Sequence, residues 1–148
     1  MRIADLLRSK GSTVVTVAPE TTVTELLARL AEYNVGALVV VGDGGELAGI
    51  VSERDVVRRI HEHGPALLSR PVSEIMTMIV ATCEPTDSVD QLSAVMTERR
   101  IRHVPVLVDG GLGGIVSIGD VVKSRMDELQ LNQEQLEAYI SGTFHSTG

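Results

Sequence analysis

The sequence predicts a mixed α/β (α+β) protein made of two tandem β-α-β-β-α repeats, packed sheet to sheet with pseudo-two-fold symmetry, plus a long C-terminal helix. Three observations lead to this prediction. The chain contains an internal repeat, each copy alternates short apolar runs with helically spaced apolar residues, and helical spacing continues far beyond the second copy. With 148 residues, 43% of them hydrophobic, the chain can form one compact domain or two small repeats.

The internal repeat has an offset of 66 residues, at which Pro19 aligns with Pro85. The second copy lacks one residue after its Asp-Gly-Gly turn. The alignment then resumes with Gly-Ile-Val-Ser at 49–52 on Gly-Ile-Val-Ser at 114–117. So many identities in one order, over about 45 residues per copy, indicate that the two copies share one fold.

The sequence pattern of each copy predicts the same five elements. The two sheets should pack together, because the few elements of one copy cannot cover both faces of its small sheet. A capping-box pattern marks the first helix, and an Asp-Gly-Gly turn joins the two strands that follow. In chain order the sequence predicts strands at 14–17 and 79–83, helices beginning at Thr22-x-x-Glu25 and Ser88-x-x-Gln91, strands at 37–41 and 104–108, strands ending at Ser52 and Ser117, and helices beginning near Arg54 and Gly119.

These elements divide the chain into four parts. Residues 1–63 form the first repeat with an N-terminal segment, and residues 64–77 form a linker and lead-in to the second repeat, with Gly64, Pro65 and Pro71 in it. Residues 78–125 form the second repeat, and residues 126–148 form a helical extension and tail.

Apolar residues after Asp120 recur at spacings of four and three, which predicts one long helix with an a/d seam. We expect this helix to end before Gly142 and the last six residues to fray. Its apolar stripe would otherwise face water, so the sequence predicts a homodimer, with a polar residue in the seam that helps to fix the register. The seam positions are Val122, Met126, Leu129, Gln133, Leu136 and Ile140.

Composition and charge exclude several classes of protein. The net charge of −7 and the scarcity of aromatic residues (one Phe, two Tyr, no Trp) argue against nucleic-acid binding. No apolar run reaches the length of a membrane span, and no signal-peptide core is present at the N-terminus. A single cysteine, Cys83, excludes an internal disulfide and fits a cytoplasmic protein.

The most specific motif is Gly-Ile-Val-Ser-x-x-Asp, which occurs twice and ends in Ser52 and Asp55 or in Ser117 and Asp120. It places Ser at a strand-to-helix junction and Asp three residues later. An ionised Asp can accept both hydroxyls of a ribose, and the Ser hydroxyl and free amides at the helix start favour a phosphate. The alternative from the residues alone is structural, with Ser as the helix N-cap and Asp complementing the helix dipole.

These motifs, with the Arg-His-Val-Pro-Val stretch at 102–106, resemble the CBS family, in which paired repeats form a Bateman module. The resemblance covers residues 11–60 and 78–125. In detail, the chain is similar to small stand-alone bacterial CBS-pair proteins. It implies an adenine nucleotide ligand (AMP, ADP, ATP or an NAD-type molecule) between the repeats. It also implies a pseudo-two-fold pair of sites and a disc-like dimer of pairs.

The resemblance implies that basic residues before the second copy's buried strand face the ligand phosphates, which selects Arg102 and His103. Strand alternation points the two side chains to different faces, so one of them would reach the ligand. The preceding Arg99 and Arg100 are interpreted as a solvated helix end.

The first copy has Gly36-Ala37 at the place of this basic pair, so its phosphate donors would be others: Arg54 and Arg58 beside Asp55, and more weakly Lys10. The two sites are therefore expected to be unequal.

The sequence favours a regulatory module without catalysis. It shows no nucleophile–base–orienter set, no cofactor fingerprint and no metal-ligand spacing, since His61-x-His63 lacks further ligands. Two alternatives remain, a ligand-free structural dimerisation module and a nucleotide-hydrolysing enzyme. With no effector domain attached, the module would act on an unidentified regulated protein or by holding nucleotide.

Overall fold

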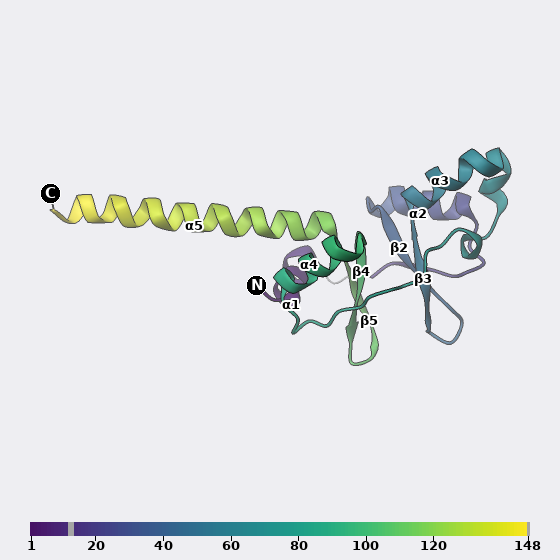
Figure 1. Cartoon of the computed structure of the whole chain (residues 1–148), viewed down its shortest axis with the longest axis horizontal. Coiled ribbons are helices and arrows are strands. Elements are labelled where there is room, and N and C mark those ends of the chain that lie inside the picture. The colour runs from purple at the N-terminus through teal and green to yellow at the C-terminus, as the bar shows by residue number, and fades with distance from the viewer. Residues whose placement is uncertain (12–13, 148) are drawn as a thin grey trace.

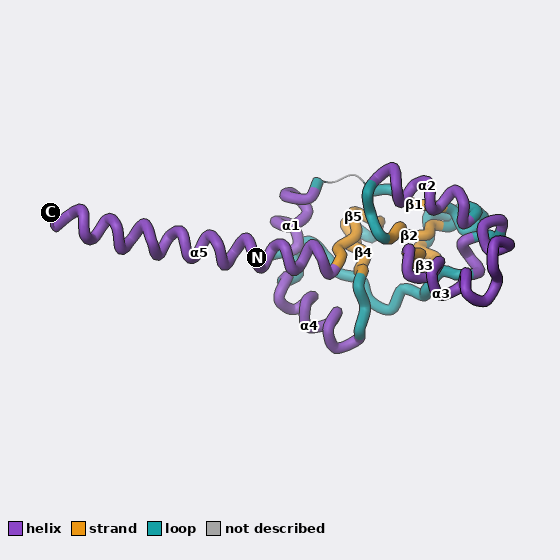
Figure 2. The backbone as a smooth tube through the Cα atoms, turned by 90° about the horizontal axis from the view of Figure 1, so that it is seen from above, coloured by secondary structure: helices purple, strands orange, loops and turns teal. Residues whose placement is uncertain are grey.

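The computed structural model describes residues 1–11 and 14–147, with side chains up to residue 141; Gly148 of the predicted tail lies outside the described residues. Two small α+β units lie side by side, and one long helix projects from the second of them (Figure 1). Seen from above, the strands of both units lie at the centre and the helices lie outside (Figure 2). The predicted pair of repeats with facing sheets and a C-terminal helix is thus confirmed.

The first repeat follows the predicted order. Thr22 caps its first helix through a complete capping box, because its side chain accepts from the amide of Glu25 and the Glu25 carboxylate accepts from the amide of Thr22. Within the sheet the first two strands are parallel and the second pair is antiparallel. Its elements are β1 (Thr16–Val17), α2 (Val23–Tyr33), β2 (Ala37–Val41), β3 (Leu47–Ser52) and α3 (Glu53–His63).

The second repeat matches this plan except at its first strand, where the prediction of a strand at 79–83 is wrong in extent. Only Cys83 lies beside the next strand, in one parallel bridge to Val106, because β-forming residues need a partner strand and 79–82 have none. The Ser88 hydroxyl caps the first helix by accepting from the amides of Asp90 and Gln91, but the Gln91 side chain does not complete a capping box. The elements are α4 (Val89–Arg99), β4 (His103–Val108), β5 (Gly111–Ser117) and α5 (Ile118–Thr147).

The lead-in segments of the two repeats are exchanged crosswise. The N-terminal helix α1 (Ile3–Lys10) packs on the second repeat, and the 3₁₀ turns η1 (Gly64–Ser69) and η2 (Val72–Glu74) pack on the first. Equivalent hydrogen bonds fix both segments: the amide of Val72 donates to Thr21 (2.8 Å), and the amide of Ile3 donates to Asp87 (2.9 Å). The segment after α3 therefore completes the first core rather than merely linking the repeats.

Apolar side chains form two separate cores, one in each repeat. Both are built mainly from Val, Leu and Ile, as the near absence of aromatic residues predicts. The first contains Val17, Val23, Leu26, Leu30, Leu38, Val40, Val51, Val56, Leu67, Val72 and Ile75, and the second contains Ile3, Leu6, Cys83, Val89, Leu92, Met96, Val104, Val106, Val116 and Val121.

The last helices of the two repeats differ in length, 11 residues in α3 and 30 in α5. Gly64, with a positive φ of 63°, ends α3, and Pro65 prevents its continuation. The aligned positions in the second copy are Leu129 and Gln130, which both favour a helix. The prediction that α5 stops before Gly142 is wrong, because one glycine costs a helix only about 1 kcal/mol and no proline follows it.

Candidate functional site

Both copies of the Gly-Ile-Val-Ser-x-x-Asp motif form helix caps. Ser52 accepts a hydrogen bond from the amide of Asp55 (3.3 Å), and Oδ2 of Asp55 accepts one from the amide of Ser52 (2.8 Å). The second motif repeats this, with the amide of Asp120 donating to Ser117 (3.1 Å) and the amide of Ser117 donating to Oδ2 of Asp120 (2.9 Å). The helix-capping role that the sequence suggested for these residues is thus present, and it uses only Oδ2 of each carboxylate.

A third residue contacts each motif Asp, and here the copies differ. The hydroxyl of Thr77 donates to Oδ1 of Asp55 (3.0 Å). The ammonium of Lys10 instead contacts Oδ2 of Asp120 (2.6 Å) and also donates to the carbonyl of Ile115 (2.6 Å). Lys10, expected beside the first motif, therefore lies at the second, because the helix that carries it packs on the second repeat.

The Lys10 contact sets the charge of the second motif. Burial raises the pKa of Asp120, but the hydrogen bonds from Lys10 and Ser117 more than offset that effect and hold the pKa below its usual value. Asp120 is therefore ionised at neutral pH. Its Oδ1 accepts no hydrogen bond among the described residues, so one carboxylate oxygen is open to a ligand hydroxyl.

His103 lies within electrostatic reach of both motif aspartates. It pairs with Ser117 across the β4–β5 ladder. Burial lowers its pKa, Lys10 lowers it further, and the carboxylates of Asp120 and Asp55 act in the opposite direction. Because the charges of both motif carboxylates reach the imidazole, this one side chain relates the two repeats electrostatically. The lowered pKa favours the neutral form of His103 at pH 7, in which one ring nitrogen donates a hydrogen bond and the other accepts one.

Arg102 and His103 have different surroundings, as strand alternation predicts. Arg102 is exposed, and its charge still acts on His103, whereas the imidazole is half-buried. The carbonyl of Arg102 accepts from the amide of Ile118 (2.8 Å), as that of Gly36 accepts from Glu53 (3.0 Å) in the first repeat. Each strand start therefore anchors the helix start that carries the motif Asp.

The basic residues expected at the first site lie apart from its carboxylate. Arg54 and Arg58 are exposed on α3, and neither forms an ion pair in the part of the chain that the structure describes. Arg99 donates to the carbonyl of Val80 (3.1 Å), and Arg100 ends α4 in a left-handed conformation, so both belong to the helix end as predicted.

Sequence reasoning missed Thr77, the partner of Asp55. It belongs to the segment 71–77, whose resemblance to the family was noted, but a lone Thr has no spacing that links it to a residue 22 positions earlier. The backbone supplies the connection, because Thr77 and Ile50 exchange two hydrogen bonds of 2.8 and 2.9 Å.

The remaining candidates carry no site. Cys83 is buried, and burial together with the charge of Asp87 raises the pKa of its thiol to about 12, so the thiol is unreactive at neutral pH. Within residues 1–11 and 14–141, whose side chains are described, no three His, Cys, Asp or Glu side chains gather in a way that could hold a metal ion. The same residues include no helix that is long and apolar enough to cross a bilayer.

Sequence comparison identifies the repeats. The CBS domain family matches residues 3–62 and 72–127. The mitochondrial CBS domain-containing protein CBSX3 of Arabidopsis thaliana is 39% identical over 150 residues, which cover 96% of this chain and 73% of that protein. The CBS domain-containing protein YhcV of Bacillus subtilis is 34% identical over 113 residues, 76% of this chain and 79% of that protein.

Solved structures agree. A CBS-domain containing protein from Agrobacterium tumefaciens superposes with a TM-score of 0.80 at 44% identity, covering 84% of this chain and 99% of that one. The CBS domain pair of protein MJ0100, in complex with 5′-methylthioadenosine and S-adenosyl-L-methionine, superposes with a TM-score of 0.73 at 25% identity, covering 83% and 98%. With two matched repeats and this shared architecture, the chain belongs to the CBS domain family as a tandem CBS pair.

Proposed function

We propose that this protein is a regulatory module that binds an adenine nucleotide between its two CBS repeats, without catalysis. One observation carries the proposal: the charges of Asp55 in the first repeat and of the Lys10–Asp120 pair at the second motif all act on the half-buried His103. Carboxylates that can accept ribose hydroxyls, beside donors that can bind a phosphate, suit a nucleotide.

The ligand class follows from the parts of the site. The motif Asp would accept ribose hydroxyls, and the motif Ser and the helix-start amides would favour the phosphate. At the second site Arg102 and His103 would bind phosphate oxygens, and at the first site Arg54 and Arg58 would do so. The adenosine-containing ligands of the MJ0100 pair support an adenine base, so AMP, ADP, ATP and NAD-type molecules are the candidates.

The regulatory role needs a second molecule. We propose that nucleotide occupancy changes how the module contacts a separate, unidentified protein, and that the module acts as a homodimer in the cytoplasm. The exposed apolar residues of α5 and the buried, unreactive Cys83 favour these last two proposals.

Calorimetry with AMP, ADP, ATP and NAD tests the binding function. At least one should bind, and the double variant Asp55→Ala/Asp120→Ala should lose that binding. Asp127→Ala, which removes an exposed carboxylate from α5, is the matched control and should bind normally.

Failure of all four ligands to bind or to raise the melting temperature would leave the ligand-free structural dimer as the better account. Steady nucleotide hydrolysis that Asp120→Asn abolishes would show an enzyme instead.

A further inference from the structure

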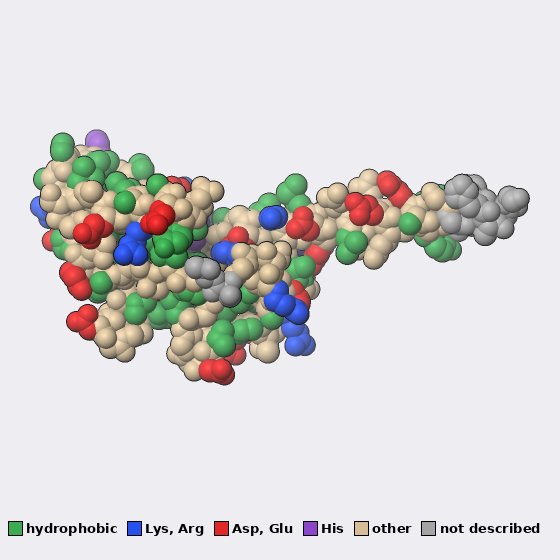
Figure 3. All heavy atoms as spheres, turned by 180° about the vertical axis from the view of Figure 1, so that it is seen from behind, with side chains coloured by type: hydrophobic (Ala, Val, Ile, Leu, Met, Phe, Trp, Pro, Cys, Tyr) green, Lys and Arg blue, Asp and Glu red, His purple; other side chains and the backbone are tan. Residues whose placement is uncertain are grey.

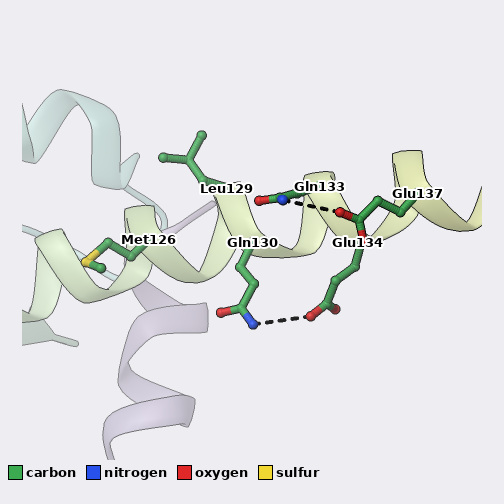
Figure 4. Close-up of a pocket in the computed structure, with 6 residues that line it drawn as sticks. All are labelled: Met126, Leu129, Gln130, Gln133, Glu134 and Glu137. Atoms are coloured by element: carbon green, nitrogen blue, oxygen red, sulfur yellow. Dashed lines mark hydrogen bonds between the residues drawn. The ribbon is translucent and has the colours of Figure 1, made fainter.

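One face of α5 remains uncovered although it is apolar. Beyond the second repeat the helix projects from the body, and hydrophobic side chains lie along it in the space-filling view (Figures 1 and 3). Leu129 and Leu136 are 67% and 60% exposed, and Met126 is 64% exposed. Met126 and Leu129 line a shallow groove on this face together with Gln130, Gln133, Glu134 and Glu137 (Figure 4).

This face is distinct from the one that holds α5 on the body. Val121 and Ser124 are buried against the second repeat, whereas Val122 and Met126 are exposed. At about 100° per residue, the seam from Val122 to Ile140 is turned by roughly 130°, more than a third of a turn, from the side that carries Val121 and Ser124. The seam can therefore accept another helix without disturbing the repeat.

Two charged residues flank the seam without ion-pair partners in the described chain. Lys123 makes no ion pair or hydrogen bond there, and Glu137 accepts only a hydrogen bond from Gln133 (3.3 Å). With Val122 and Leu129 at d positions, Lys123 and Glu137 both occupy e positions. They lie 14 residues apart, about 21 Å along the helix.

The direction of a partner helix decides whether these charges meet. In a parallel in-register pair, e positions face g positions, so Lys123 and Glu137 would face Ile118 and Asn132. In an antiparallel pair centred near residue 131, Lys123 lies opposite Glu137 of the second copy, and this happens twice by symmetry. The same register sets Val122 opposite Ile140 and Met126 opposite Leu136, and a shift by one heptad loses the charge pairing.

We propose that α5 binds α5 of a second copy of this chain as an antiparallel two-helix coil, with Lys123 of each copy paired to Glu137 of the other. This rests on the homodimer proposed above and assigns its surface, direction and register, in place of the disc-like dimer of pairs that the family resemblance implies. Each copy then covers the seam of the other, and the two CBS pairs lie at opposite ends of the coil.

Two leucines on opposite sides of α5 test the surface. Leu136 lies in the seam and Leu131, 54% exposed, lies about 180° from it. Sedimentation of the full chain should show a dimer, and Leu136→Glu should raise its dissociation constant at least about 100-fold because it places a charge in the apolar layer. Leu131→Glu should leave it unchanged. If both variants remain dimeric, the α5 surface is wrong, while a homodimer formed elsewhere, and the nucleotide site, would stand.

Charge reversal tests the direction. Lys123→Glu or Glu137→Lys alone should weaken the dimer about tenfold at low salt, because each replaces two attractive pairs by two repulsive ones. The double variant should restore the wild-type constant, and Asp127→Lys, at an exposed carboxylate of α5 that lies outside both the seam and the groove, should have no effect. Single variants without effect, or a double variant that is not restored, would overturn the antiparallel register.

Discussion

The two motif aspartates sit on identical local frameworks and have different neighbours. Asp55 and Asp120 both cap a helix through the preceding Ser, but the third partner is the neutral hydroxyl of Thr77 in one repeat and the ammonium of Lys10 in the other. Thr77 and Lys10 belong to the lead-in segments, which diverge more than the repeated motif does. Two sites with the same motif therefore differ in charge, because residues outside the motif set the charge at each site.

The largest expected effect is on nucleotide affinity, and it should differ between removal of Asp120 and removal of Asp55. Asp120→Ala should weaken both AMP and adenosine at the second site by about 100-fold, since it removes charge-assisted hydrogen bonds to the ribose. Asp55→Ala should leave that site nearly intact. Calorimetry of each variant with both ligands measures this, and equal losses in the two variants would mean that the sites are not separate.

The next effect concerns the basic pair that the first copy lacks. Arg102→Ala or His103→Ala should lower the ratio of AMP affinity to adenosine affinity about tenfold, because only AMP carries a phosphate and one charge-assisted hydrogen bond is lost. Arg59→Ala, on exposed α3, is the control. An unchanged ratio in both variants would return Arg102 and His103 to a purely structural role.

Removing Lys10 or Thr77, the third partners of the two motif aspartates, should show that they contribute unequally to the stability of the fold. Lys10→Met should lower the free energy of unfolding by about 1–2 kcal/mol, and Thr77→Val by about 1 kcal/mol or less, since only Lys10 makes a charged hydrogen bond. The folded-state pKa of Asp120 is depressed, so its contribution is present above the unfolded pKa near 4 and is lost as pH falls through the lower folded value. Urea unfolding should show the Lys10→Met deficit at pH 7 and a smaller deficit in acid.

The smallest effect is a pH dependence from His103. Its folded pKa lies below its ordinary value, so the neutral form stabilises the fold fully above about pH 6.5 and less as the pH falls. His103→Gln should flatten the fall in stability between neutral and mildly acidic pH. A wild-type stability that rises on acidification through this range would contradict the direction of the shift.

The features that occur in both copies of the repeat could be predicted from the sequence. The offset of 66 residues is visible in the structure, where Val17 pairs with Val40 and Cys83 with Val106 in the same parallel manner. Capping at Ser52 and Ser117 follows from strand-to-helix patterning that local residues decide.

The sequence could not predict what depends on contacts between distant segments. The position of Lys10 against Asp120 joins residues 110 positions apart, and no local pattern marks it. Likewise, the shortening of the strand at 79–83 depends on which neighbour is present, a tertiary effect that overrides β-propensity. The extension of α5 past Gly142 has a different, local cause, because a glycine alone weakens a helix without ending it.

The crosswise lead-in segments also set an order of assembly during synthesis. The first core uses residues only between Val17 and Ile75, so it can close soon after that part of the chain leaves the ribosome. Helix α1 emerges earlier still, yet Ile3 and Leu6 join a core that extends to Val121. Ile3 and Leu6 can therefore join their core only after the second repeat has been made, and the contact between Lys10 and Asp120 can form no earlier than that.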